Sequence, residues 1–143
     1  MKGLRTLGAP YSEEEIANAL YKPSYISFEY ALAYYSILPE MPYKVTCATT
    51  KPTRIFTVVD IDFAYYTIKN EAYTGYSLVK TESKLFLIAE REKALVDYLY
   101  FENLGKRPHN DRLVIKDIDK AKLIKYAKIY GRASLMDLVK RYL

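Results

Sequence analysis

The spacing of apolar residues changes twice along this chain of 143 residues, and no other feature constrains the fold as strongly. Both ends carry apolar residues at the three- and four-residue intervals of a helix. The middle instead carries short runs rich in Val, Ile, Thr, Tyr and Phe, which are typical of strands. Helices, then strands, then helices again is the order of an α+β protein.

The middle of the chain predicts five strands, at residues 43–50, 53–59, 63–69, 76–80 and 84–89. The segments between them are too short to hold a crossover helix. Because antiparallel strands need only a short turn, we expect neighbouring strands to be antiparallel. The sequence therefore predicts a mainly antiparallel five-stranded sheet, flanked by helices at both ends of the chain.

Capping signals place the helices. Ser12 precedes three glutamates, which predicts a capping box and a helix that ends near Leu20. Pro23 ends that segment, and Ser27 is positioned to cap a second helix. Further helices are expected over 90–103 and 117–130, and from a cap at Ser134 to the end of the chain. In the helix over 90–103, Lys93 and Asp97 are expected to form an i,i+4 pair on the polar side.

Length and composition narrow the class of protein. One chain of this length without a Gly- or Ser-rich linker predicts a single domain over 1–143. One cysteine and one histidine exclude a disulfide scaffold and a Cys/His zinc site. No phosphate-binding glycine motif is present, so we expect no cofactor. Neither a membrane-length apolar stretch nor an apolar leader in residues 1–10 is found, which predicts a cytoplasmic protein without a membrane partner.

The formal charge of +5 is unevenly distributed. Residues 1–103 carry 11 Lys and Arg against 13 Asp and Glu, whereas residues 104–143 carry 11 against 4. The basic excess thus lies entirely in a helical end, 104–143, which favours a nucleic acid or an acidic partner there.

Three groups of basic residues are candidates for binding nucleic acid or a partner. The first lies along one side of the helix over 117–130, and the second lies in the loop before it. The third lies in a turn between two predicted strands, where hydroxyls accompany the cations. A solvated helix face and a polar hairpin tip are the alternative explanations. The candidates are Lys122, Lys125 and Lys128, then Lys106, Arg107 and Arg112, then Lys51 and Arg54.

Catalytic alternatives are also open. Asp60 or Asp62 with Glu82 and Lys84 resembles the carboxylate and lysine set of Mg²⁺-dependent restriction-type nucleases. Surface charge at turns explains the same residues. A nucleophilic site would need Cys47 or the single histidine, His109, and neither has an orienting pattern beside it.

The sixteen tyrosines leave a third alternative, a structural module whose tyrosines form a homodimer surface. Tyrosine has an apolar body and a polar tip, so it suits both half-buried sheets and interfaces. The bulk features of the chain do not decide between these alternatives.

Longer stretches of the sequence are more specific for a protein family than these bulk features. They are IANALYKPSYIS at 16–27, VTCATTK at 45–51 and IAEREKALVDYLY at 88–100, with shorter matches at 31–40, 63–65 and 75–76. In this order they resemble the AbiEi-type antitoxins, which are regulators in type IV toxin–antitoxin systems of phage defence. The resemblance covers residues 11–143.

The resemblance implies a non-enzymatic antitoxin or transcriptional regulator that counters a nucleotidyltransferase-type toxin without forming a stable complex with it. Members of this family typically place an N-terminal winged helix, which binds operator DNA, before a domain similar to this chain. The chain begins about ten residues before the matching region. We therefore expect the winged helix to be absent, and nucleic-acid contact to depend on the basic helical end.

Overall fold

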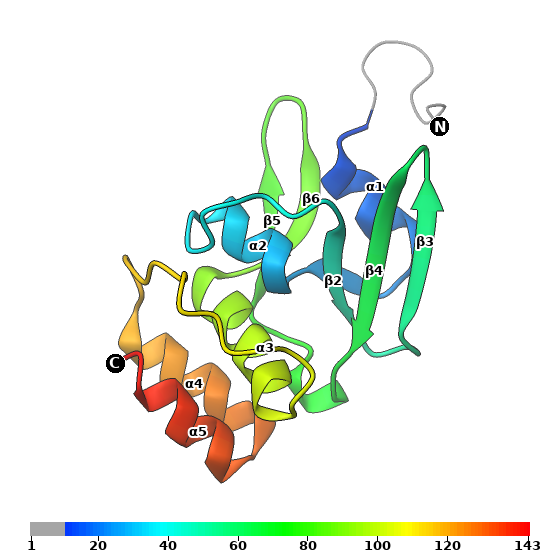
Figure 1. The fold of residues 1–143 in the computed structure, drawn as a ribbon. Helices are drawn as coiled ribbons and strands as arrows, with labels where there is room; N and C mark the ends of the chain where they lie inside the picture. The colour runs from blue at the N-terminus through cyan, green and yellow to red at the C-terminus, as the bar shows by residue number, and fades with distance from the viewer. Residues whose placement is uncertain (1–10) are drawn as a thin grey trace.

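The computed structural model describes residues 11–143, and the expectation of no leader in residues 1–10 lies outside this range. The described chain forms an α+β fold, as the sequence predicts, with five α-helices, one short 3₁₀ helix at Asn70–Ala72 and one sheet (Figure 1). The sheet has six strands rather than five. They are β1 (Ser24–Ile26), β2 (Val45–Thr49), β3 (Arg54–Val58), β4 (Ile61–Thr67), β5 (Tyr76–Lys80) and β6 (Leu85–Ala89).

The predicted antiparallel pairing is wrong for part of the sheet. The strand order is β3-β4-β2-β1-β6-β5, and the pairs β2–β4 and β1–β6 are parallel. Strand β3 reverses the chain between β2 and β4 and lies outside them at the sheet edge. It therefore acts as the crossover that a helix would otherwise provide. The remaining pairs, β1–β2, β3–β4 and β5–β6, are antiparallel.

Strand β1 was not expected from the sequence, because it has only three residues and directly follows Pro23. Its residues are all buried, and it lies between β2 and β6 near the centre of the sheet. This strand joins the two halves of the sheet, which would otherwise be separate sets of paired strands.

Helices cover both faces of the sheet. Neighbouring side chains on a strand point to opposite faces, and Tyr65 and Tyr66 of β4 show which helix lies on each. The hydroxyl of Tyr65 donates to the backbone oxygen of Ala17 in α1 (Glu13–Leu20) at 2.5 Å. The ring of Tyr66 instead packs edge-on against Phe28 of α2 (Phe28–Tyr34) and Phe101 of α3 (Arg91–Asn103).

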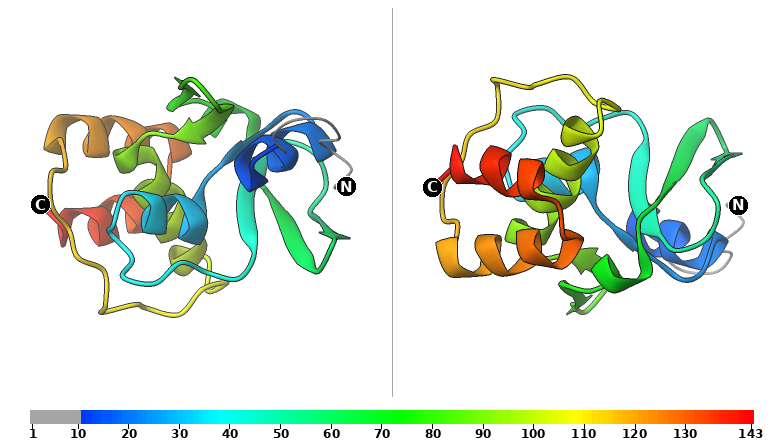
Figure 2. Two further views of the ribbon diagram at one scale, coloured as in Figure 1. Left: turned by 90° about the horizontal axis from the view of Figure 1, so that it is seen from above. Right: turned by 90° about the horizontal axis from the view of Figure 1, so that it is seen from below.

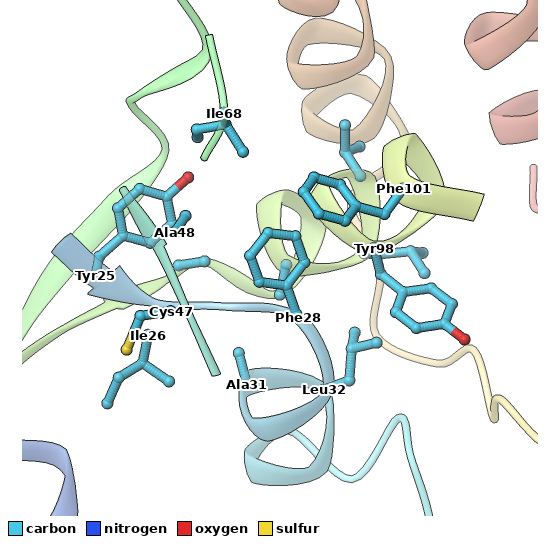
Figure 3. Packing of buried hydrophobic residues seen from close by; sticks show 14 of the residues in the cluster. Tyr25, Ile26, Phe28, Ala31, Leu32, Cys47, Ala48, Ile68, Tyr98 and Phe101 are labelled. Atoms are coloured by element: carbon cyan, nitrogen blue, oxygen red, sulfur yellow. The ribbon is translucent and has the colours of Figure 1, made fainter. Parts of the chain in front are cut away.

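The carboxyl-terminal helices α4 (Lys120–Tyr130) and α5 (Ala133–Lys140) pack on α3 and on each other. They lie at the opposite end of the molecule from the edge strand β3 in each of the three views (Figures 1 and 2). Between the two ends, the core packs Phe28 against Phe101 at 4.9 Å, with Leu32 and Tyr98 close by (Figure 3). One hydrophobic core thus joins the sheet to the helices.

Helix boundaries test the capping predictions. The capping box of Ser12 and Glu15 is present at the start of α1. Ser27 holds the cap position of α2 without a side-chain cap bond, since its hydroxyl donates to Asp97 at 2.7 Å. Helix α4 begins after Asp119, which caps it, and α5 begins after Arg132 rather than after Ser134.

Within residues 11–143, no helix combines the length and the apolar character that a membrane crossing would require.

Candidate nucleic-acid interface

The first candidate group lies on α4. Asp119 starts this helix by accepting a hydrogen bond from the backbone of Lys122, and Gly131 ends it in a left-handed conformation. The side chains of Leu123, Tyr126, Ala127 and Tyr130 are buried against the rest of the molecule. This burial fixes the rotation of the helix, so Lys122, Lys125 and Lys128 are all exposed to solvent, as the sequence predicts.

Two of these three ammonium groups have weak contacts in the protein. The Lys122 ammonium lies 3.6 Å from a carboxylate oxygen of Glu90, with about half of the lysine side chain exposed. That of Lys125 lies 5.6 Å from the ring of Tyr126. Exposed contacts of this kind hold a lysine only loosely. The lysines of α4 therefore stay available for an anion.

The loop between α3 and α4 presents its basic residues differently. The Arg107 guanidinium is half-buried, donates to Glu29 at 2.7 Å and lies 4.6 Å from the ring of Tyr66. Burial lowers the pKa of Arg107, but the Glu29 carboxylate and Tyr66 together outweigh burial and raise this pKa. Arg107 thus ties the loop to the core, and little of it is free for a ligand.

The other two basic candidates in this loop are exposed. Arg112 is paired with Glu40, and both side chains are more than half exposed to solvent. The ammonium of Lys106 lies 5.7 Å from the Phe101 ring. Because an exposed ion pair contributes little, Arg112 can exchange Glu40 for another anion.

The third group lies on the sheet. Lys51 lies in the turn before β3, with its ammonium 4.4 Å from the ring of Tyr21. Arg54 is the first residue of β3 and lies 4.7 Å from the ring of Phe56. Arg54 and α4 thus belong to opposite ends of the molecule (Figures 1 and 2). The eight candidates do not form one continuous surface, and the lysines of α4 are the group that a single element aligns.

The structure does not assemble the nuclease set. Asp60 and Asp62 lie at the turn between β3 and β4, beside Tyr43. Glu82 and Lys84 lie at the turn between β5 and β6, where Lys84 donates to Glu14 at 3.5 Å. No group of three or more His, Cys, Asp or Glu side chains is placed to hold a metal ion in the part of the chain that the structure describes.

The nucleophile candidates are also separated. Cys47 is fully buried in β2, and burial raises the pKa of its thiol well above the usual value. His109 is exposed in the loop after α3, where its Nδ1 lies 3.3 Å from Glu102. A thiol that stays protonated and a distant imidazole do not form a catalytic pair.

The exposed tyrosines are spread over the molecule. Tyr11 precedes α1, Tyr34 lies in α2, Tyr43 precedes β2 and Tyr76 lies in β5. Several other tyrosines are buried and donate hydrogen bonds inside the core. The homodimer surface therefore stays a prediction from composition.

The sequence prediction was wrong about the environment of Lys93 and Asp97, which it placed on the polar side of the helix. Lys93 and Asp97 form an i,i+4 pair with their charged groups 2.6 Å apart, but both side chains are fully buried. The face of α3 that carries them packs against β1 and α4. The Asp97 carboxylate also accepts hydrogen bonds from Tyr25, Ser27 and Tyr130, at 2.9, 2.7 and 2.6 Å.

The cluster around Lys93 and Asp97 is closed to solvent, and both of its charged groups are hydrogen-bonded. Lys93 also donates to the Tyr25 hydroxyl at 2.8 Å. Burial, and then the negative charge of Asp97, raise the pKa of Tyr25 and of Tyr130 well above the usual value. These five groups hold β1, α3 and α4 together, and none of them can reach a ligand. No signal in the sequence indicated this, because the five residues come from distant segments.

Comparisons with protein-family models, curated proteins and solved structures find no match to this chain. Any assignment of function therefore depends on the residues and their arrangement.

Proposed function

We propose that this protein is a non-enzymatic antitoxin or regulator domain that counters a nucleotidyltransferase-type toxin and contacts nucleic acid through the exposed side of α4. The resemblance of its sequence to AbiEi-type antitoxins supports the first part. The second part is supported by the lysines of α4, which one rigid helix presents to solvent.

The single observation that carries the nucleic-acid proposal is this row of three lysines. Their spacing of three residues places successive lysine Cα atoms about 4.5 Å apart along the helix axis, from the rise of 1.5 Å per residue. Such a row can contact successive phosphates of one strand, and each contact releases a counterion from the nucleic acid. The buried side of α4, anchored by Tyr126 and Tyr130, keeps the row from rotating away.

Neighbouring positive charges extend the same field. Lys106 and Arg112 in the loop before α4 are exposed, and α5 carries exposed Lys140 and Arg141 near its end. These side chains would attract a polyanion before it contacts α4. No base-reading element is proposed, since phosphate contacts position a nucleic acid without reading its sequence.

Growth rescue tests the antitoxin part. The chain is expressed together with a nucleotidyltransferase-fold toxin of an AbiEi-type system, and growth is compared with that of cells carrying the toxin and an empty vector. We expect the chain to restore growth without co-purifying with the toxin. Unchanged growth arrest, with the chain present as soluble protein, would contradict the antitoxin assignment.

A further inference from the structure

A groove with no role in the proposed function opens between the end of α1, the start of β1 and the β5–β6 hairpin. Its volume is about 570 Å³, which lies within the range of small-molecule sites. One wall is apolar and consists of Leu78, Leu85 and Leu87. Leu78 and Leu85 are each more than half exposed, although both are large apolar side chains.

A buried hydroxyl in this groove has no partner. Ser24 is the first residue of β1 and is 3% exposed, and its Oγ makes no hydrogen bond. A buried hydroxyl without a partner is destabilising, so proteins rarely keep one without a reason. A ligand atom placed against Ser24 would give this hydroxyl a partner.

Two tyrosine rings continue the lining of the groove beside the leucine wall. Tyr76 stacks on the buried ring of Tyr25 at 4.8 Å, and Tyr73 packs against Tyr76 at 5.3 Å. Neither the Tyr73 nor the Tyr76 hydroxyl donates to another residue in the described range. Tyr76 remains about one-third exposed, which leaves ring surface for a flat partner.

Among the described residues that line the groove, one carries a charge, and that charge is positive. Lys22 is the only lining residue that is charged at neutral pH, and within residues 11–143 it has no ion-pair partner. No carboxylate of the described residues lines the groove to oppose an anion. An ammonium at the rim of an apolar, tyrosine-lined groove fits a ligand that carries a negative group at one end.

The walls of the groove are held in place without a ligand. The side-chain amide of Asn18 accepts from the Leu87 backbone N–H at 2.6 Å and donates to the Leu87 carbonyl at 3.4 Å, which ties α1 to β6. Thr49 donates to the carbonyl of Pro23 at 2.7 Å and fixes the segment before β1. A site that is already formed loses little conformational entropy when a ligand binds.

We infer that this groove binds a small anion with one flat ring. The ring would lie against Tyr76 and the leucines, the negative group would pair with Lys22, and a polar atom beside the ring would bond to Ser24. Nucleoside monophosphates and aromatic carboxylates both have this chemistry, and the experiment below separates them.

Isothermal titration calorimetry of the full chain tests the inference with defined probes. AMP and UMP represent the nucleotides, and indole-3-acetate represents the aromatic carboxylates. Adenosine, which lacks the charge, and inorganic phosphate, which lacks the ring, are the controls. We expect one of the two anion types to bind at least roughly tenfold more tightly than both controls.

Variants tie that binding to the groove. Lys22→Ala is expected to weaken ligand binding roughly tenfold, as for the loss of one charge-assisted hydrogen bond. Lys80→Ala is the control and is expected to leave binding unchanged, because Lys80 lies on β5 but outside the lining of the groove. Ser24→Ala is expected to weaken binding while the free protein keeps or gains thermal stability, because it removes a hydroxyl that has no partner. No binding of either anion type at millimolar concentration, or binding that Lys22→Ala and Ser24→Ala leave unchanged, would overturn the inference.

Discussion

Asp97 accepts four hydrogen bonds inside the core, and its nearest cation, Lys93, is as fully buried as the carboxylate itself. Two charges removed from water are tolerated only because each is fully partnered. The pair is therefore sensitive to the loss of either member. At the scale of single residues, this cluster controls stability more than any exposed charge does.

Asp97→Asn is expected to lower the free energy of unfolding by about 3–5 kcal/mol, since it leaves the Lys93 charge buried without a counter-charge. The double variant Lys93→Met/Asp97→Asn should recover part of that loss, because no buried charge remains. Urea unfolding of both variants measures the difference. A double variant that is no more stable than Asp97→Asn would contradict the coupling of the pair.

The raised pKa values of Tyr25 and Tyr130 predict sensitivity to alkali. In the unfolded chain these hydroxyls lose their protons near pH 10.0, while the folded chain keeps them. The folded state then binds more protons, so stability is retained below pH 10 and falls above it, by about 1.4 kcal/mol per pH unit for each tyrosine.

Unfolding by urea across this range, followed together with the ultraviolet absorbance of tyrosinate, checks the prediction. The tyrosinate signal of the buried rings should appear only as the protein unfolds. Tyr130→Phe should reduce the loss of stability above pH 10, although it also removes one hydrogen bond to Asp97. Stability that stays constant up to pH 12 would contradict the assigned burial.

At the scale of elements, the turn before β5 packs closely against α3 and α4 at Gly75. The φ of Gly75 is +79°, and its carbonyl accepts a hydrogen bond from the Glu90 backbone at 2.8 Å, where α3 begins. A Cβ at this position would lie 2.8 Å from Lys93 Cγ and 2.9 Å from Tyr126 Cε1. The turn before β5 therefore needs a glycine for both its conformation and its space.

Gly75→Ala is expected to destabilise the protein by about 2–4 kcal/mol, from the left-handed conformation and from overpacking. Gly105→Ala is the matched control. It has a similar φ of +77° but no atom within 4 Å of an added Cβ, so it should cost only about 1–2 kcal/mol. Thermal unfolding of the two variants compares them directly. Equal losses would contradict the close packing of α3, α4 and the turn.

The sequence predicted most elements but not how the strands pair. Capping at Ser12 and the apolar period of α4 are local signals, and both predictions are confirmed. The pairing of β2 with β4 depends on contacts between distant segments, and β1 is too short to show a period. The same limit explains Lys93 and Asp97, whose spacing on a helix says nothing of what covers that face.

The sequence likewise predicted one part of the candidate site and missed another. The exposure of Lys122, Lys125 and Lys128 follows from the helical period, and the sequence predicted it. The burial of Arg107 against Tyr66 does not follow from any local pattern. The groove beside Ser24 was missed because its lining comes from three separate segments, residues 18–24, 73–78 and 85–87.

At the scale of the whole molecule, the negative and the positive excess of charge lie on different parts of the fold. The sheet and the first three helices carry a small negative excess, while α4, α5 and the loop before them carry the positive excess. Because α4 and α5 pack on α3 at one end of the molecule, their positive charge would steer a polyanion to that end and not to the sheet (Figure 1). The central claim is that the α4 lysines make this contact.

Binding to a short DNA duplex, followed by fluorescence anisotropy over a series of salt concentrations, tests the claim most directly. The wild-type chain is compared with Lys122→Gln/Lys125→Gln/Lys128→Gln and with a control of equal charge change, Lys44→Gln/Lys80→Gln/Lys84→Gln, whose residues lie away from α4. We expect the affinity of the α4 variant to fall and its logarithmic salt dependence to decrease by about two to three, since each phosphate contact contributes about 0.9. The control should keep the slope of the wild type. Equal slopes for all three proteins, or no binding by the wild type at low salt, would contradict the account.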